Sequence, residues 1–482
     1  MWHTHSIAEL GQAMADGRLT AVTLTQHFLD RIAALNHAGP ALNAVRELNP
    51  QALASAAEVD AERAAGRVRG PLHGLPVLLK DNIATGDGMA CTAGSLALAT
   101  LRPRHDAGLV RRLRAAGAVI LGKCNMTEFA DYLSDVMPSE FSSAGGVVRH
   151  PHGKRYDRGG GSSVGPACAV AAGLCVAAIG SETQNSIQTP ASQSGVVGVK
   201  PTVGLVSRAG VVPLAISQDT AGPLARRVAD AAVLLTALAG VDLDDTLTLA
   251  AGPQVDADYA RHLDPHGLHG ARIGVPRQVY FGRAGHEAAE AVTEQAIATL
   301  RAAGAIIVDP ADVPTAHEVA RLRSSVFARE FRAGLEAFLA AQGEAAPLPT
   351  LADIIAFNEA HAEQCLPYGQ ALAEAAARTD GLDAAAYHAD RRRDITLSRD
   401  LGIDAVCRQY RLDALLTPAG AAAKLTGKAG YPAVTVPAGF TDDGMPVGVS
   451  FIGPAFSEGR LLALAHAFEL ARGELSALPD GL

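Results

Sequence analysis

The sequence has few aromatic residues and few charged residues. Aromatic residues make up 4% of the 482 residues and charged residues 19%, whereas hydrophobic residues reach 48%. Globular proteins carry about 25% charged residues, so this composition excludes a disordered chain or an extended array of solvated helices. The hydrophobic core is therefore expected to consist mainly of Ala, Val, Leu and Ile.

The sequence also lacks a long run of basic residues. Its formal net charge is −9, and the short cluster Arg391–Arg393 is followed directly by Asp394. Sequence-independent binding of nucleic acid requires a basic face, so we expect no nucleic-acid partner. We interpret the arginine cluster as the solvated face of a helix.

The six cysteines form no C-x-x-C pair and no spacing typical of a zinc site or a disulfide framework. This pattern indicates a reducing compartment, and with no charged and apolar leader at the N-terminus it predicts a cytoplasmic protein without a metal. The most apolar stretch, 164–180, contains Pro166 and falls short of the roughly 20 residues of a membrane span. We expect a buried helix and strand there, and no association with a membrane.

Short apolar runs alternate with amphipathic helical patterns along most of the chain. Such alternation predicts an α/β fold, a large mixed, mostly parallel twisted sheet covered by helices on both faces. No internal repeat or long Gly/Ser linker interrupts it, so residues 1–482 are expected to form a single domain. Residues 315–400 are mainly helical in pattern and are expected to form a cap-like region over the sheet.

One apolar run ends in a lysine, which is unusual. The segment 74–83 reads GLPVLLKDNI and predicts a buried strand that ends at Lys80. A buried ammonium group is costly, so the lysine either has a chemical role or extends past the sheet edge to solvent. This segment alone does not decide between the two interpretations.

Two small polar clusters flank a predicted helix and strand further along. The first, 159–165, reads GGGSSVG, and the second, 180–191, reads GSETQNSIQTPA. The glycines permit backbone conformations that other residues resist. A phosphate-binding loop is an alternative for the first cluster, but no Gly-Lys-Ser/Thr follows it and the dinucleotide-binding pattern is not convincingly met.

These motifs together resemble those of the amidase signature hydrolases. The resemblance rests on the segments 74–82, 160–165, 180–191 and 195–202, and it extends to 122–129 and 430–439. Ser162 and Ser186 lie 24 positions apart, the spacing of the relay serine and the nucleophile in that family. The segments 201–208 and 217–223 look most like the bacterial peptide-amidase branch.

The resemblance implies a catalytic triad of Lys80, Ser162 and Ser186 that needs no cofactor. Ser186 would be the nucleophile, Ser162 a proton relay that follows a cis peptide bond, and Lys80 the base. A serine hydroxyl needs a base, and a lysine serves if burial lowers its pKa from about 10.4 toward about 7–8.

Further site residues follow from the same resemblance. Backbone N–H groups of the turn Thr183-Gln184-Asn185-Ser186 would form the oxyanion hole. Ala130 aligns with a family position whose carbonyl contacts the substrate amide. Ser163 is a candidate for substrate binding or for hydrogen bonds that support its own loop, and Ser181 for orienting Lys80 or Ser162.

The sequence departs from the family pattern around the nucleophile. Gln184 and Asn185 replace a Gly-Gly pair, which raises the question of whether the turn can adopt a positive φ; Asn tolerates that conformation better than Gln. Gln188 replaces an arginine that often meets a substrate carboxylate, which suggests a neutral group near the scissile bond and argues against a transamidase component.

We therefore expect a hydrolase of small neutral amides or peptide C-terminal amides, active as a monomer or homodimer on a small-molecule amide or carbamate. A carbamate, ester or aryl-amide hydrolase that uses the same site is one alternative. A catalytically silent binding protein with the amidase fold is another. The third is one component of a heteromeric transamidase.

Overall fold

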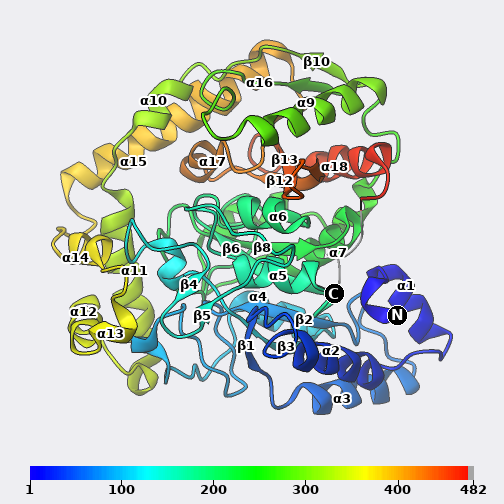
Figure 1. Ribbon diagram of the computed structural model, residues 1–482, viewed down its shortest axis with the longest axis vertical. Helices are drawn as coiled ribbons and strands as arrows, with labels where there is room; N and C mark the ends of the chain where they lie inside the picture. Colours follow the sequence, from blue (N-terminus) through cyan, green and yellow to red (C-terminus); the bar gives the residue numbers. More distant parts are fainter. Residues whose placement is uncertain (476–482) are drawn as a thin grey trace.

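A single large sheet runs through the protein and organises the helices around it (Figure 1). The computed structural model describes residues 1–475. The sheet has 11 strands, which follow in spatial order: β1 (Val45–Leu48), β3 (Val119–Cys124), β2 (Pro76–Lys80), β6 (Ala177–Glu182), β8 (Thr220–Ala225), β7 (Val197–Lys200), β12 (Ala433–Phe440), β13 (Pro446–Ile452), β11 (Ala414–Pro418), β9 (Arg272–Gly274) and β10 (Ile306–Val308). A separate hairpin pairs β4 (Phe141–Ser142) with β5 (Gly146–Val147).

The sheet is mixed, as the sequence predicts. Parallel pairing joins β3, β2 and β6 in one block and β11, β9 and β10 in another. The strands between these blocks, and β1 at the edge, pair antiparallel. The expected predominance of parallel pairing therefore holds within the two blocks and not across the centre of the sheet.

Helices cover both faces of the sheet. On one face, α5 and α6 contact each other and pack on strands from β2 to β13. On the other face, α7 and α18 contact each other and pack on β7, β8, β12 and β13. The helices are α1 (Ile7–Ala15), α2 (Ala21–Leu35), α3 (Ala52–Ala64), α4 (Gly108–Ala115), α5 (Val164–Ala171), α6 (Gln188–Ser194), α7 (Val228–Leu238), α8 (Leu247–Ala251), α9 (Glu287–Ala302), α10 (Ala316–Arg321), α11 (Val326–Gln342), α12 (Leu351–Ala360), α13 (Ala362–Cys365), α14 (Ala371–Ala377), α15 (Ala385–Ser398), α16 (Asp404–Tyr410), α17 (Ala423–Ala429) and α18 (Glu458–Arg472).

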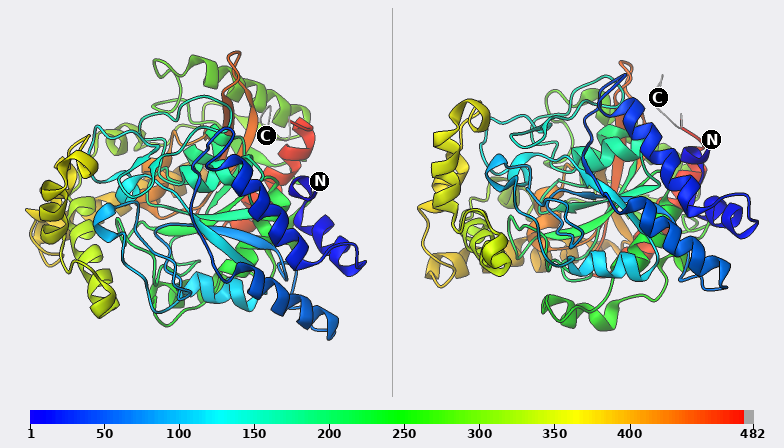
Figure 2. Two further views of the ribbon diagram at one scale, coloured as in Figure 1. Left: turned by 60° about the horizontal axis from the view of Figure 1, so that its bottom comes forward. Right: turned by 90° about the horizontal axis from the view of Figure 1, so that it is seen from below.

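The stretch 315–400 is helical, as expected, and comprises α10 to α15. Helices α11 to α14 lie on the opposite side of the molecule from α1 to α3 (Figure 2). A second apolar cluster, distinct from the main core, packs α11 and α12 against the loop residues Phe129, Leu133 and Leu214. The helical region is thereby attached to the loops at the edge of the sheet.

Three elements differ from the sequence expectations. Strand β8 was not expected because its sequence contains Gly222 and Pro223, residues that usually interrupt a strand. Strand β1 was not predicted because it has only four residues, and α6 was not predicted because it begins inside the motif 180–191, which was interpreted only for its chemistry. The apolar stretch 164–180 forms α5 and most of β6, both buried, and across residues 1–475 no helix is long and apolar enough to cross a membrane.

Candidate active site

The carboxyl ends of two neighbouring parallel strands bring the candidate residues together. Strand β2 ends at Lys80, and β6 ends at Glu182, just before the turn 183–186. Because β2 and β6 pair in parallel, their carboxyl ends meet at the same edge of the sheet. Every residue of both strands is buried, so Lys80 enters the interior instead of reaching solvent.

The Lys80 ammonium group is fully buried and has three oxygen partners. Its Nζ donates to Ser162 Oγ at 2.7 Å, to Ser181 Oγ at 3.0 Å and to the Ser181 carbonyl at 3.1 Å. Burial lowers the Lys80 pKa to about 7, and the nearby carboxylates of Glu182 and Asp219 only partly oppose this shift. A substantial fraction of Lys80 is therefore neutral at pH 7 and able to accept a proton.

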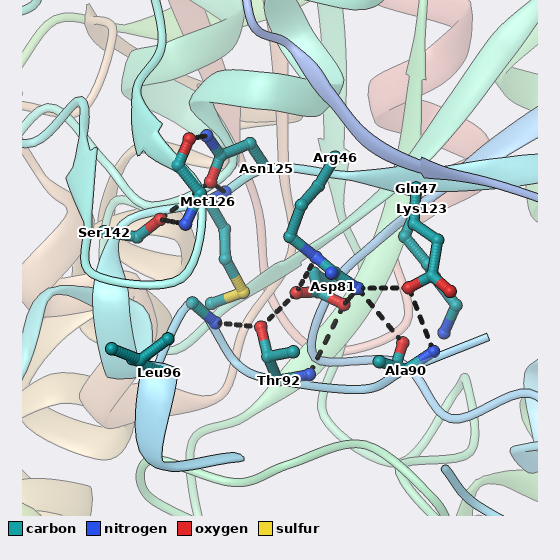
Figure 3. A network of polar contacts seen from close by, with 12 residues as sticks. Arg46, Glu47, Asp81, Ala90, Thr92, Leu96, Lys123, Asn125, Met126 and Ser142 are labelled. Atoms are coloured by element: carbon teal, nitrogen blue, oxygen red, sulfur yellow. Dashed lines mark hydrogen bonds and ion pairs between the residues drawn. The ribbon is translucent and has the colours of Figure 1, made fainter. Parts of the chain in front are cut away.

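A polar network fixes the chain just beyond Lys80 (Figure 3). The Asp81 carboxylate accepts a hydrogen bond from the Thr92 hydroxyl and forms an ion pair with Arg46, whose Nε lies 2.6 Å from it. Asp81 is fully buried, so this pairing satisfies a charge that would otherwise destabilise the fold. The network holds the end of β2 in place and leaves Lys80 free to face Ser162.

The glycine-rich loop brings Ser162 beside the segment that carries Ser186. The peptide bond between Gly161 and Ser162 is cis. The Ser163 backbone N–H donates to the Ser186 carbonyl at 3.1 Å. The Ser163 side chain is fully buried and donates to the Ser181 carbonyl at 3.1 Å, which supports the loop, and substrate binding by Ser163 stays a prediction.

The turn before Ser186 adopts the left-handed conformation at one position, Asn185, whose φ is 79°. Asparagine tolerates this conformation, so Gln184 is not required to adopt it and the concern raised by the sequence does not apply. Within residues 1–475, the backbone N–H groups of Gln184, Asn185 and Ser186 make no hydrogen bond, nor does the Ser186 hydroxyl. Free donors grouped in this way form an anion-binding concavity.

Side chains that the sequence did not single out support this turn. The Thr183 hydroxyl donates to the buried Asp219 carboxylate at 2.5 Å. The Gln184 side chain donates to Gln218 at 2.7 Å, and Asn185 Nδ2 donates to the Gly159 carbonyl at 2.7 Å. Hydrogen bonds to neighbouring segments thus hold the side chains of the two residues that replace glycine.

Gln188 does not have the substrate-facing role suggested by the sequence. Its side chain is fully buried and donates to Glu182 at 2.6 Å. The same carboxylate accepts from the backbone N–H of Ile187 at 2.7 Å and of Gln188 at 3.0 Å, at the start of α6. Gln188 therefore fixes the chain after Ser186, and the neutral substrate group inferred from the missing arginine stays a prediction.

Ser186 lines a cavity of about 460 Å³, a size suited to a small organic ligand. The loops at 130–160 contribute Ala130 and Gly159 to its wall, Gly161 follows just beyond them, and the helical stretch 315–400 contributes Ala316 and Phe327. Segments without any motif complete the wall and were missed, notably Val279, Tyr280, Arg283, Leu214, Gly420, Ala421, Ala423, Lys424 and Leu425.

The cysteines lie apart from this cavity. All six are free and buried, and burial raises the pKa of Cys91 and Cys175 to about 12. Across the part of the chain that the structure describes, no three His, Cys, Asp or Glu side chains cluster in a way that could hold a metal ion.

A close packing contact predicts how sensitive the turn is to displacement. Gly427 of α17 lies against the turn, and a Cβ at this position would approach the Thr183 carbonyl to 2.5 Å and overlap the Gln184 side chain. Gly427→Ala is therefore expected to shift the turn and lower kcat by about 10- to 100-fold, measured on any accepted amide. Gly11→Ala in α1 is the matched control, because a Cβ there meets nothing within 4 Å. Equal kcat values for the two variants would contradict the prediction.

Comparison with known proteins places this fold and site in one family. The sequence model of the Amidase family matches residues 23–428 and 421–462. A peptide amidase from Stenotrophomonas maltophilia is 47% identical, with a TM-score of 0.91 over 96% of each chain. An amidase family protein from Bacillus anthracis is 34% identical, with a TM-score of 0.91 over 99% of this chain and 92% of that one. A probable amidase of Arabidopsis thaliana is 38% identical over 97% of this chain and 90% of its own length.

These matches define an amide-hydrolysing enzyme. The chain belongs to the amidase signature family, as its motifs suggest, and the fold expected from them is confirmed. It is also similar to a glutamyl-tRNA(Gln) amidotransferase subunit from Ralstonia pickettii, with 35% identity over 97% of each chain.

Proposed function

We propose that this enzyme hydrolyses the C–N bond of small neutral amides or peptide C-terminal amides through an acyl-enzyme, with Ser186 as nucleophile, Ser162 as relay and Lys80 as base. The observation that carries the proposal is the 2.7 Å contact between Lys80 Nζ and Ser162 Oγ, buried beside the cavity that Ser186 lines. The chain acts as one domain, with the helical region 315–400 as a cap on the cavity.

The contacts of Lys80 support a defined direction of proton transfer. A neutral amine has two N–H donors and one lone pair. The carbonyl and hydroxyl oxygens of Ser181 accept the two donors, which leaves the lone pair for the Ser162 hydroxyl. Ser162 gives its proton to Lys80 and takes the proton of Ser186, whose oxygen then attacks the amide carbonyl.

The free N–H groups of the turn stabilise the charge that develops. When the Ser186 oxygen bonds to the carbonyl carbon, the substrate oxygen becomes an anion, and N–H groups of Gln184, Asn185 and Ser186 donate to it. Each such donor contributes about 2.7–4 kcal/mol to the transition state. Collapse breaks the C–N bond, and the proton held by Lys80 passes through Ser162 to the departing amine. Water then hydrolyses the ester at Ser186 by the same route.

The comparisons favour a peptide amide over an amidotransferase substrate. The similarity to the peptide amidase, 47% identity and a TM-score of 0.91, exceeds that to the glutamyl-tRNA(Gln) amidotransferase subunit of Thermotoga maritima, 28% and 0.70. A carboxamide has a small departing group, so the cavity needs room mainly for the acyl part. The Ala130 carbonyl, on the cavity wall, accepts a hydrogen bond from the amide nitrogen.

A substrate screen tests this proposal. We expect the enzyme to release ammonia from peptide C-terminal amides, with kcat/KM higher than on matched carbamates or aryl esters. Faster hydrolysis of the carbamate or ester would replace the amidase proposal with the alternative hydrolase function. Absence of turnover on all three classes, together with retained binding, would support a catalytically silent protein instead.

A further inference from the structure

Asp131 places a carboxylate without a partner at the cavity wall. The residue lines the same cavity as Ser186, and in residues 1–475 its side chain makes no hydrogen bond and no ion pair. Burial raises its pKa to about 7, while the nearby positive charge of Lys80 has the opposite effect. Asp131 is half-buried and no protein donor satisfies its side chain, so a donor group of a ligand in the cavity can bind there.

The backbone around Asp131 is held in an uncommon conformation. Phe129, Ala130 and Asp131 have φ values of 45°, 57° and 73°, a left-handed region that residues other than glycine, asparagine and aspartate rarely adopt. Such residues gather at functional sites, where the surroundings impose the conformation. Three in succession turn the loop sharply at the cavity wall.

Aromatic contacts on both sides of Asp131 anchor this turn. The Phe129 ring packs edge-on against Phe331 of α11 at a centroid distance of 5.6 Å. The Tyr132 ring packs against Phe331 at 5.3 Å and against Phe327 at 5.7 Å. With its neighbours fixed in the helical region, Asp131 has little freedom to leave the cavity for bulk solvent.

Within residues 1–475, the cationic side chains at the cavity form no ion pair with Asp131, although the charges of Lys80 and Arg158 act to lower its pKa. Lys424 also lines the cavity, but its Nζ donates to the carbonyls of Ala320 and Leu322, both at 2.9 Å. The Lys80 ammonium is already shared between Ser162 and Ser181. In its ionised form the Asp131 carboxylate accepts hydrogen bonds from N–H groups of a ligand and repels a ligand carboxylate.

We propose that Asp131 is a specificity-determining residue that binds an amino or ammonium group on the acyl part of the substrate, so that the enzyme prefers amides that carry a free amine near the scissile bond. The inference rests on the proposed amidase function. A primary amide loses only its nitrogen, so all other groups of the substrate, including the amine, belong to the acyl part. The proposal therefore narrows the substrate class to amides of amino acids or short peptides.

A matched pair of substrates tests the assignment. The probe is an α-amino-acid amide with a free amine, compared with its N-acetyl derivative, which has the same side chain and no positive charge. Asp131→Asn is nearly isosteric and is expected to lower kcat/KM on the free-amine substrate by about 10- to 100-fold, with little change on the acetylated one. Asp135→Asn, at an exposed position four residues further on, is the matched control and should leave both values unchanged.

The outcomes separate the two proposals. Equal losses on both substrates, or no loss on either, would overturn the role of Asp131 while leaving amide hydrolysis intact. If the wild-type enzyme hydrolyses neither substrate, the proposed function fails, and calorimetry decides about Asp131: the free-amine amide should bind Ser186→Ala at least about tenfold more tightly than Ser186→Ala with Asp131→Asn. Equal affinities would refute the assignment, and Asp131→Glu should recover part of the preference.

Discussion

Ser186→Ala is expected to abolish turnover, with kcat falling by about 10⁶-fold while the fold remains stable. The loss is large because removal of the hydroxyl eliminates the nucleophile and leaves Lys80 and Ser162 with no group to activate. The melting temperature should change little, because the Ser186 hydroxyl makes no hydrogen bond within residues 1–475 that its removal would break. The measurement is single-turnover kinetics on a peptide amide together with thermal denaturation.

The variant also separates catalysis from binding. Ser186→Ala should still bind a peptide amide, because Gln184, Asn185 and the remaining walls of the cavity are unchanged. Residual activity within about tenfold of the wild type would contradict the assignment of the nucleophile, since contamination and background hydrolysis do not reach that level. A comparable loss of thermal stability would instead indicate a structural role for the residue.

Lys80→Met is expected to lower kcat/KM by about 10²–10⁴-fold and at the same time to stabilise the protein. The activity falls because Met cannot accept the Ser162 proton. Burial lowers the folded-state pKa of Lys80 from 10.5 to about 7, so between these pH values the unfolded chain binds a proton that the folded chain lacks. Lys80 therefore destabilises the fold at pH 7 and less so as the pH rises toward 10.5. Met removes this effect, and we expect a gain on the order of 2–4 kcal/mol at pH 7, after allowance for the lost hydrogen bonds.

Two measurements check the Lys80 prediction. In the wild type, kcat/KM should rise with pH through about 7, because only the neutral amine accepts a proton. The residual activity of Lys80→Met should lack this rise. Urea denaturation at pH 7 should show the gain in stability. A variant that loses stability while it keeps the wild-type pH profile would assign Lys80 a structural role.

Local sequence patterns predicted most of the helices and strands. The elements that they did not predict depend on pairing between segments far apart in the chain. The helices α2 and α9 and the strands β2 and β3 follow from hydrophobic spacing within one segment. Strand β8 does not, because its residues Gly222 and Pro223 have low strand propensity and are held by pairing with Gly180 and Ile179 of β6. The directions of the central strands likewise depend on partners far away in the chain.

The candidate site could be predicted only as far as its motifs extend. Lys80 and Ser162 lie 82 positions apart, and the sequence indicated their contact at 2.7 Å only through the family resemblance of their motifs and not through any local pattern. The replacement of Gly-Gly by Gln184 and Asn185 looked unfavourable in sequence. The hydrogen-bond partners of their side chains, Gln218 and Gly159, belong to other segments, so the local sequence does not reveal them. The cavity wall at 279–283 and 420–425 carries no motif, so only the folded arrangement identifies it.

Covalent labelling is the most direct test of the central proposal that Ser186 is the activated nucleophile. The folded enzyme, incubated with a fluorophosphonate at about pH 8, where Lys80 is mostly neutral, should acquire one adduct, and peptide mapping by mass spectrometry should place it on Ser186. The adduct should be absent from Ser186→Ala and should form far more slowly in Lys80→Met. Absence of labelling on the folded wild-type enzyme, or an adduct on another serine, would contradict the account.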